Sequence, residues 1–169
     1  MWNDYLSLKL IHLCAAILWS ASALGAFWYL IVSTWERRQD PSPEQVRRDD
    51  WLRYHFGFVV MVEHLAFFVL VPTGLQLARV LSLPLFTPWM MPWLAAKLLI
   101  VWGLFIPMEV LDIWLSHWVL PRRYHRREVE HEAWVQARRW HDLFLVVGGA
   151  LVVLGIPAVL YLIVMKPRF

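Results

Sequence analysis

The chain has 169 residues, of which 60% are hydrophobic and 17% are charged, and its formal net charge is +3. One soluble core of this size cannot bury so much apolar surface, so the composition excludes an ordinary water-soluble protein and indicates a lipid bilayer as the solvent. The single cysteine, Cys14, excludes an intramolecular disulfide and a cysteine-rich metal or iron–sulfur site within one chain.

Four apolar stretches are long enough to cross a membrane, whose hydrocarbon core requires about 20 helical residues. They are residues 5–33, 55–79, 92–120 and 141–165. The first stretch is too long for a secretory signal and lacks a preceding basic cluster and an A-x-A cleavage pattern, so we expect it to remain in the mature protein. The sequence predicts an all-α, polytopic membrane protein, with one membrane domain over residues 1–169 built as a four-transmembrane-helix bundle.

Basic residues are concentrated in two predicted loops, residues 34–54 and 121–140, which hold most of the 16 lysines and arginines. Cytoplasmic loops carry an excess of Lys and Arg, so we expect both loops in the cytoplasm and both termini on the periplasmic side of a bacterial-type inner membrane. We interpret the arginines as topology signals and lipid headgroup contacts. A nucleic-acid partner is not expected, because no nucleic-acid-binding motif accompanies them.

Both polar loops are predicted to contain helix. In the first loop, the motif SPEQ can cap a short helix through Ser42. The third loop has good helix formers after Pro121 and predicts a cytoplasmic helix that extends the third span or lies on the surface. Within the third span, Pro107 is expected to introduce a kink. Tryptophans near the span ends, such as Trp35 and Trp134, are typical of the aromatic belt at a membrane interface.

An outer layer of ionisable side chains lies within the spans, where each costs about 2.5–3.5 kcal/mol on insertion scales. At about 1.5 Å per residue, His12 lies ~9 Å and Lys97 ~5 Å below the outer edges of their spans. We therefore expect these two side chains to share a layer, with Arg79 just above it. His12 has few polar partners at that depth, which favours a ligand or catalytic role. Lys97 has either a functional role or, like Lys9, snorkels to the interface.

A second polar layer lies nearer the cytoplasmic side. It contains Glu63, His64, Glu109 and Asp112, and His55, His117 and His141 lie near its inner edge. Three interpretations stay open for this layer. Asp112, His117 and His141 can pair with loop arginines. Histidines on different helices can bind haem or a metal. Alternatively, Glu63, His64 and Glu109 can relay protons, because buried carboxyl groups titrate near neutrality.

Two segments resemble a known family. The segment KLIHLCAAILW, residues 9–19, resembles the first span of the HemJ-type protoporphyrinogen oxidases and of the related copper-resistance-D-like membrane proteins. The segments VPTGLQLA and WLAAKLLIV are similar to the junction of their second and third spans. The resemblance covers spans 1 to 3, and the chain departs from the family pattern after Trp19 and after Lys97. It implies that His12, associated with bound haem b, and Lys97 are the catalytic pair.

These observations predict a membrane protein that binds haem b and takes part in membrane redox or electron-transfer chemistry, with HemJ-like porphyrinogen oxidation as one candidate reaction. We expect His12 to be the first axial ligand and His64 a candidate second one, although their estimated depths differ. Lys97 and Arg79 would bind the haem propionates. Electrons would pass between a membrane quinone or porphyrin and a redox partner protein or larger membrane complex, in a homo- or hetero-oligomer.

Two other functions stay open. A copper-handling or transport protein would bind Cu(I) through methionine and imidazole side chains, which suit this soft ion. Its candidate ligands are His12, Met61, His64, Met108 and Glu109. A small accessory subunit of a larger membrane complex would carry no cofactor of its own and would use its tryptophan-rich faces for protein contacts.

Overall fold

The computed structural model describes residues 2–167, and every regular element within that range is helical. The helices are α1 (Trp2–Gln39), α2 (Pro43–His55), α3 (Gly57–Val80), η1 (Pro88–Met90), α4 (Pro92–Ile100), η2 (Val101–Phe105), α5 (Ile106–Ile113), η3 (Trp114–Val119), α6 (Leu120–His125) and α7 (His131–Met165). Helices α2 and α3 follow each other almost directly, and α4 to α6 form one continuous rod. Four helices are long and apolar enough to span a membrane, so the expected all-α membrane bundle is confirmed.

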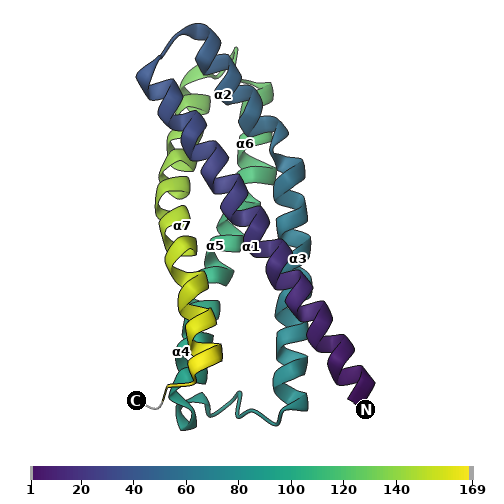
Figure 1. The fold of residues 1–169 in the computed structure, drawn as a ribbon. Helices are drawn as coiled ribbons and strands as arrows, with labels where there is room; N and C mark the ends of the chain where they lie inside the picture. The colour runs from purple at the N-terminus through teal and green to yellow at the C-terminus, as the bar shows by residue number, and fades with distance from the viewer. Residues whose placement is uncertain (1, 168–169) are drawn as a thin grey trace.

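The helices are longer than a bilayer is thick. Helix α1 has 38 residues and α7 has 35, which correspond to about 57 Å and 53 Å against about 30 Å of hydrocarbon. The turns at residues 40–42 and 126–130 lie together at one end of the bundle (Figure 1). We call this the arginine-rich end, because it carries the arginines of residues 37–53 and 122–139. The opposite, terminal end holds both termini and the connection at residues 81–91.

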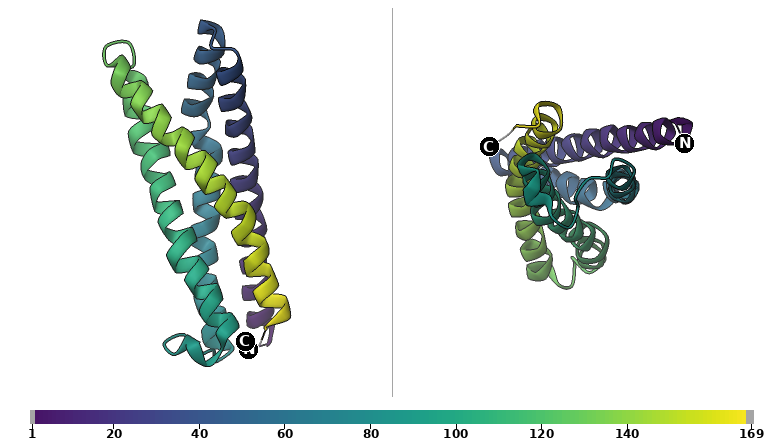
Figure 2. Two further views of the ribbon diagram at one scale, coloured as in Figure 1. Left: turned by 90° about the vertical axis from the view of Figure 1, so that its left-hand side faces the viewer. Right: turned by 90° about the horizontal axis from the view of Figure 1, so that it is seen from below.

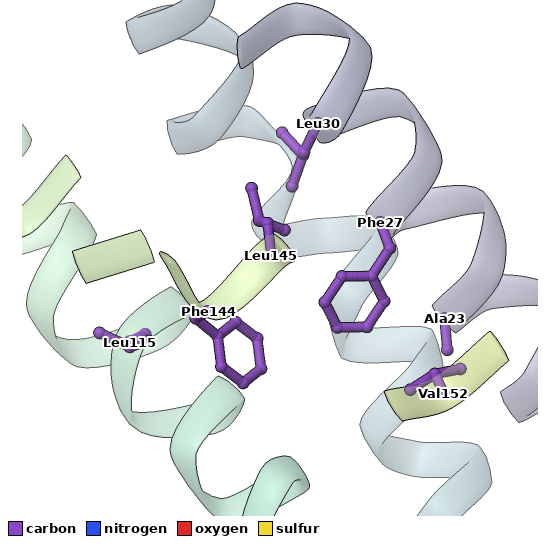
Figure 3. Close-up of a cluster of buried hydrophobic side chains, with 7 residues drawn as sticks. All are labelled: Ala23, Phe27, Leu30, Leu115, Phe144, Leu145 and Val152. Atoms are coloured by element: carbon purple, nitrogen blue, oxygen red, sulfur yellow. The ribbon is translucent and has the colours of Figure 1, made fainter. Parts of the chain in front are cut away.

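The bundle core is formed where α1 crosses α7. Phe27 and Leu30 of α1 pack with Phe144 and Leu145 of α7, in a buried cluster completed by Ala23, Leu115 and Val152 (Figure 3). Glycine permits this close approach, because a Cβ on Gly148 would lie 3.3 Å from the Phe27 ring. Outside this core, long rows of leucine, valine and isoleucine side chains remain exposed along the rods. Such a surface is suited to lipid.

The two polar loops contain helix, as expected, but with different boundaries. Ser42 is the N-cap of α2, and its hydroxyl accepts a hydrogen bond from the Gln45 amide at 3.4 Å. The helical part of the third loop is divided, because residues 120–125 extend the third rod and residues from His131 onward begin α7. Trp134 is 1% exposed and packs in a core at the arginine-rich end, so its expected place in the aromatic belt was wrong.

Two π-helical segments interrupt the third rod. Segment η2 ends just before Pro107, which lies in the first turn of α5, and η3 ends just before Pro121, in the first turn of α6. Proline has no amide hydrogen to continue an α-helical ladder, which explains the change of hydrogen-bond pattern before each proline. The short helix α5, which carries Glu109 and Asp112, is therefore bounded by a wider helical turn on each side. The bundle is seen along and across its axis in Figure 2.

Candidate functional site

His12 is held against α3 by its Nδ1 atom. This nitrogen lies 3.1 Å from the carbonyl oxygen of Leu70 and 3.0 Å from the hydroxyl oxygen of Thr73. The Thr73 hydroxyl donates to the Val69 carbonyl at 2.6 Å, so its oxygen is left to accept. Nδ1 of His12 is therefore the protonated donor, and Nε2 carries the free lone pair. This is the arrangement by which proteins orient a histidine that ligates a metal.

Glycine makes room for this imidazole. A Cβ on Gly74 would lie 2.9 Å from Cε1 of His12, closer than side chains tolerate. Lys97 of α4 is half-buried and lies within electrostatic range of His12. Arg79 lies in the last turn of α3 and is exposed.

His64 lies in a different layer from His12. Along α3, the contacts of His12 are six and nine residues beyond His64, which corresponds to about 9–14 Å. The structure therefore does not bring the two expected axial histidines together. Nδ1 of His64 is instead 2.8 Å from Oε1 of Glu109.

His64 belongs to a buried polar group that we call the carboxylate cluster: Glu63, His64, Glu109 and Asp112. All four residues are buried, with between 4% and 8% of each exposed. Nε2 of His64 lies 3.9 Å from Oδ2 of Asp112 and has no hydrogen-bond partner among the described residues. The indole nitrogen of Trp19 donates to Oε2 of Glu109 at 3.2 Å. Three helices, α1, α3 and α5, thus meet through polar contacts inside the bundle.

The carboxylate cluster borders two small cavities. The Ser116 hydroxyl donates to Oδ1 of Asp112 at 2.9 Å, and the ring of His117 packs 5.1 Å from that of His64. Glu63 and Asp112 line two cavities of about 10 Å³ each, about the space that one water molecule needs. The second cavity also reaches His141.

A separate ionic network joins the helices at the arginine-rich end. Arg53 is 3% exposed and donates to Asp49 at 2.9 Å and to Asp142 at 2.6 Å. It also donates to Nδ1 of His141 at 2.7 Å and to the Thr34 hydroxyl at 2.6 Å. We call these five residues, together with Arg37, the arginine network. It connects α1, α2 and α7.

One interpretation paired Asp112, His117 and His141 with loop arginines. His141 does accept a hydrogen bond from Arg53. Asp112 instead accepts a hydrogen bond from Ser116, and His117 packs against His64. Sequence reasoning missed Asp49, although its spacing of four residues from Arg53 on a helix signals an ion pair. Burial alone would raise the pKa of Asp49, but Arg53, the Ser33 hydroxyl and Arg37 together lower it below its ordinary value.

Two of the expected copper ligands, His12 and His64, lie in different layers of the bundle. Among residues 2–167, no group of three or more His, Cys, Asp or Glu side chains is arranged to hold a metal ion. Met61 is 47% exposed and so does not face the buried carboxylate cluster.

Comparison of the chain with protein-family models, curated proteins and solved structures gave no match.

Proposed function

We propose that this chain is an integral membrane protein that binds haem b through His12 and takes part in membrane redox chemistry. The observation that carries the proposal is the His12 imidazole. Its Nδ1 is fixed by Leu70 and Thr73, and its ring lies against Gly74, so that Nε2 keeps a free lone pair. An oriented imidazole of this kind is the usual axial ligand of haem iron.

The neighbouring residues suit a haem with one protein imidazole. Lys97 supplies a cation within electrostatic reach of His12 and would bind a propionate through a charge-assisted hydrogen bond. Arg79, at the end of α3, would serve a propionate nearer the surface. His64 is engaged with Glu109 in another layer and is not proposed as the second ligand. When bound, the haem would supply one-electron chemistry, and the chain would orient His12 and limit water access.

The sequence resemblance suggests the reaction and its partners. We propose HemJ-like porphyrinogen oxidation with His12 and Lys97 as the catalytic pair, and a membrane quinone or porphyrin as the exchange partner. The arginine distribution supports an orientation with the arginine-rich end in the cytoplasm of a bacterial-type cell and both termini on the periplasmic side.

Absorption spectra of the detergent-solubilised protein, expressed with ample haem, test the proposal. Wild type should show a Soret band and a reduced α-band, and His12→Ala should lose both. His55→Ala is the matched control, because Nδ1 of His55 bonds a carbonyl within its own helix at 2.9 Å and its side chain is exposed. A colourless wild type would refute haem binding. Bound copper in elemental analysis, or co-purified larger subunits, would then favour the alternatives.

A second pair of variants tests the surroundings of the ligand. Gly74→Ala should displace the imidazole and reduce haem occupancy, since the new methyl group would collide with Cε1. Lys97→Met should keep the spectrum but release haem more readily on dilution. Lys166→Met is the control for charge at the same end, because Lys166 lies against the Trp93 ring. Equal haem retention in both lysine variants would contradict the role of Lys97.

A further inference from the structure

We propose that the carboxylate cluster is a proton-binding site that exchanges protons with the arginine-rich end of the bundle. The proposal concerns different residues from the haem proposal and does not depend on it. It rests on the burial of four titratable groups in one contact network, on an orphaned imidazole nitrogen and on the two cavities beside them.

The charge of the cluster requires bound protons. Three carboxyl groups and one imidazole are buried together inside a membrane-spanning bundle. If the three carboxyl groups were all ionised, a protonated His64 would neutralise only one of them, and net negative charge would remain in a medium that strongly penalises it. Glu63 makes no hydrogen bond to another described side chain. A proton shared within the group removes this cost, so the cluster holds protons as part of its folded state.

His64 is placed to pass a proton between two carboxyl groups. Its Nδ1–H donates to Glu109 at 2.8 Å, and its unpartnered Nε2 faces Asp112 at 3.9 Å. In the transfer step, the O–H bond of protonated Asp112 breaks as an N–H bond forms at Nε2. The Nδ1–H bond breaks as an O–H bond forms on Glu109. The imidazole is neutral before and after, and one proton has moved from Asp112 to Glu109.

The 3.9 Å separation is longer than a hydrogen bond, so a water molecule or a small movement must complete the path. Asp112 lines a cavity of about 10 Å³, but His64 does not, so we expect a small movement to bring the two side chains together. Asp112 lies on α5 between two π-helical segments, a pattern frequent at functional sites.

The path opens toward the arginine-rich end. The second cavity is lined by Glu63, Asp112 and Ser116 on one side and by His141 on the other. His141 in turn accepts a hydrogen bond from Arg53, which belongs to the polar network at that end. A chain of titratable and hydroxyl groups therefore runs from the cluster to the arginine network.

In the opposite direction the cluster meets aromatic side chains and a second small cavity that Trp19 and Phe105 help to line. The Trp19 ring lies 5.5 Å from that of Phe67 and 5.0 Å from that of Phe105, measured between centroids. The three residues are buried with Ala66 in an apolar core next to the cluster. Phenylalanine carries no proton-exchanging group, so we expect protons to reach the cluster through the cavity that borders His141.

The titratable groups that face the cluster come from each element packed around it. They are Glu63 and His64 on α3, Glu109 and Asp112 on α5, His117 on η3 and His141 on α7. Helix α1 contributes the Trp19 indole, which does not titrate. Arg53 is in direct contact with His141 and brings a permanent cation to this network.

Infrared spectroscopy of the detergent-solubilised protein tests the proton-binding site. Wild type should show the carbonyl stretch of a protonated carboxyl group at neutral pH, with the small downward shift expected in D₂O. Glu63→Gln, Glu109→Gln or Asp112→Asn should reduce that band. Glu128→Gln, which removes an exposed carboxyl group, should leave it unchanged. These amide variants keep side-chain volume, and circular dichroism verifies their folding.

Exchange into D₂O tests the direction of access. Ala26→Leu and the smaller Ala26→Val fill the cavity toward His141 and should slow the shift of the band. Val152→Leu fills the other cavity and should leave the rate unchanged. No protonated carboxyl band at neutral pH, or a band unaffected by all three cluster variants, would overturn the site. Slowing by Val152→Leu alone would overturn the direction. Neither result bears on the Soret band, so the two proposals fail separately.

Discussion

Replacing Arg53 by methionine is expected to lower the free energy of unfolding by about 3 kcal/mol. The Arg53 guanidinium is inaccessible to solvent and contacts Asp49 and Asp142, which are buried as well. Removing one partner of a buried ion pair costs about 3–5 kcal/mol, because a charge is left buried without compensation.

We expect a value at the lower end of that range because Arg37 also contacts both carboxylates. Its Nε lies 3.0 Å from Asp49 and its Nη2 lies 2.6 Å from Asp142, so both carboxylates keep one cationic partner when Arg53 is lost. Replacing both arginines removes this compensation. The double variant should therefore be destabilised by more than the sum of the two single variants, since residues in one network do not act additively.

Chemical or thermal unfolding of the purified protein in detergent measures both effects. The matched control is Arg48→Met, because Arg48 is an exposed arginine 3.9 Å from the partly exposed Glu36. Such surface pairs contribute about 0–1 kcal/mol. If Arg53→Met were no more destabilising than Arg48→Met, the arginine network would not stabilise the packing of α1, α2 and α7.

Three further predictions concern stability. Asp49 has a folded-state pKa below its ordinary 3.8, so its contribution to stability is complete above that value and is lost as the pH falls below it. The unfolding midpoint of wild type should therefore drop steeply in acid, and the midpoint of Asp49→Asn should drop less. Gly155→Ala should destabilise by about 1–3 kcal/mol, because its Cβ would lie 2.8 Å from the Phe105 ring, whereas Gly25→Ala meets nothing within 4 Å and should be neutral or stabilising in the same thermal melt. Trp134→Ala should cost about 3–5 kcal/mol as the loss of a fully buried aromatic side chain, and an unfolding midpoint equal to wild type would contradict that burial.

The four spans were predictable because each is a long apolar run, and no other fold class can accommodate four of them. Their ends were not, because helix formation does not stop where hydrophobicity stops. Helix α1 continues to Gln39 through charged residues, and α7 begins at His131, ten residues before its apolar part. Ser42 was recognisable from the sequence because capping is a local interaction between residues three positions apart.

The polar sites were predictable in part. Depth estimates correctly separated a layer with His12 from one with His64, since helical rise alone fixes depth. Partners across helices could not be read from spacing. Arg53 and Asp142 are 89 positions apart, and His64 and Glu109 are 45 apart. These pairings depend on how the rods rotate and cross. The π-helical segments left a readable signal, because each lies just before a proline.

Trp19 lies between the two proposed sites, and this position predicts that they influence each other. It is seven residues after His12 on α1, about 10 Å along the helix axis, and its indole donates to Glu109. Two unit charges at that separation interact by about 1–2 kcal/mol at an effective dielectric constant of about 20. Proton uptake by the carboxylate cluster should therefore favour the reduced haem. A spectroelectrochemical titration of wild type should show a midpoint potential that falls as the pH rises, and Glu109→Gln should flatten that dependence while leaving the Soret band. If the midpoint potential depended on pH equally in both proteins, the protons of the carboxylate cluster would not act on the haem across Trp19, Phe67 and Phe105.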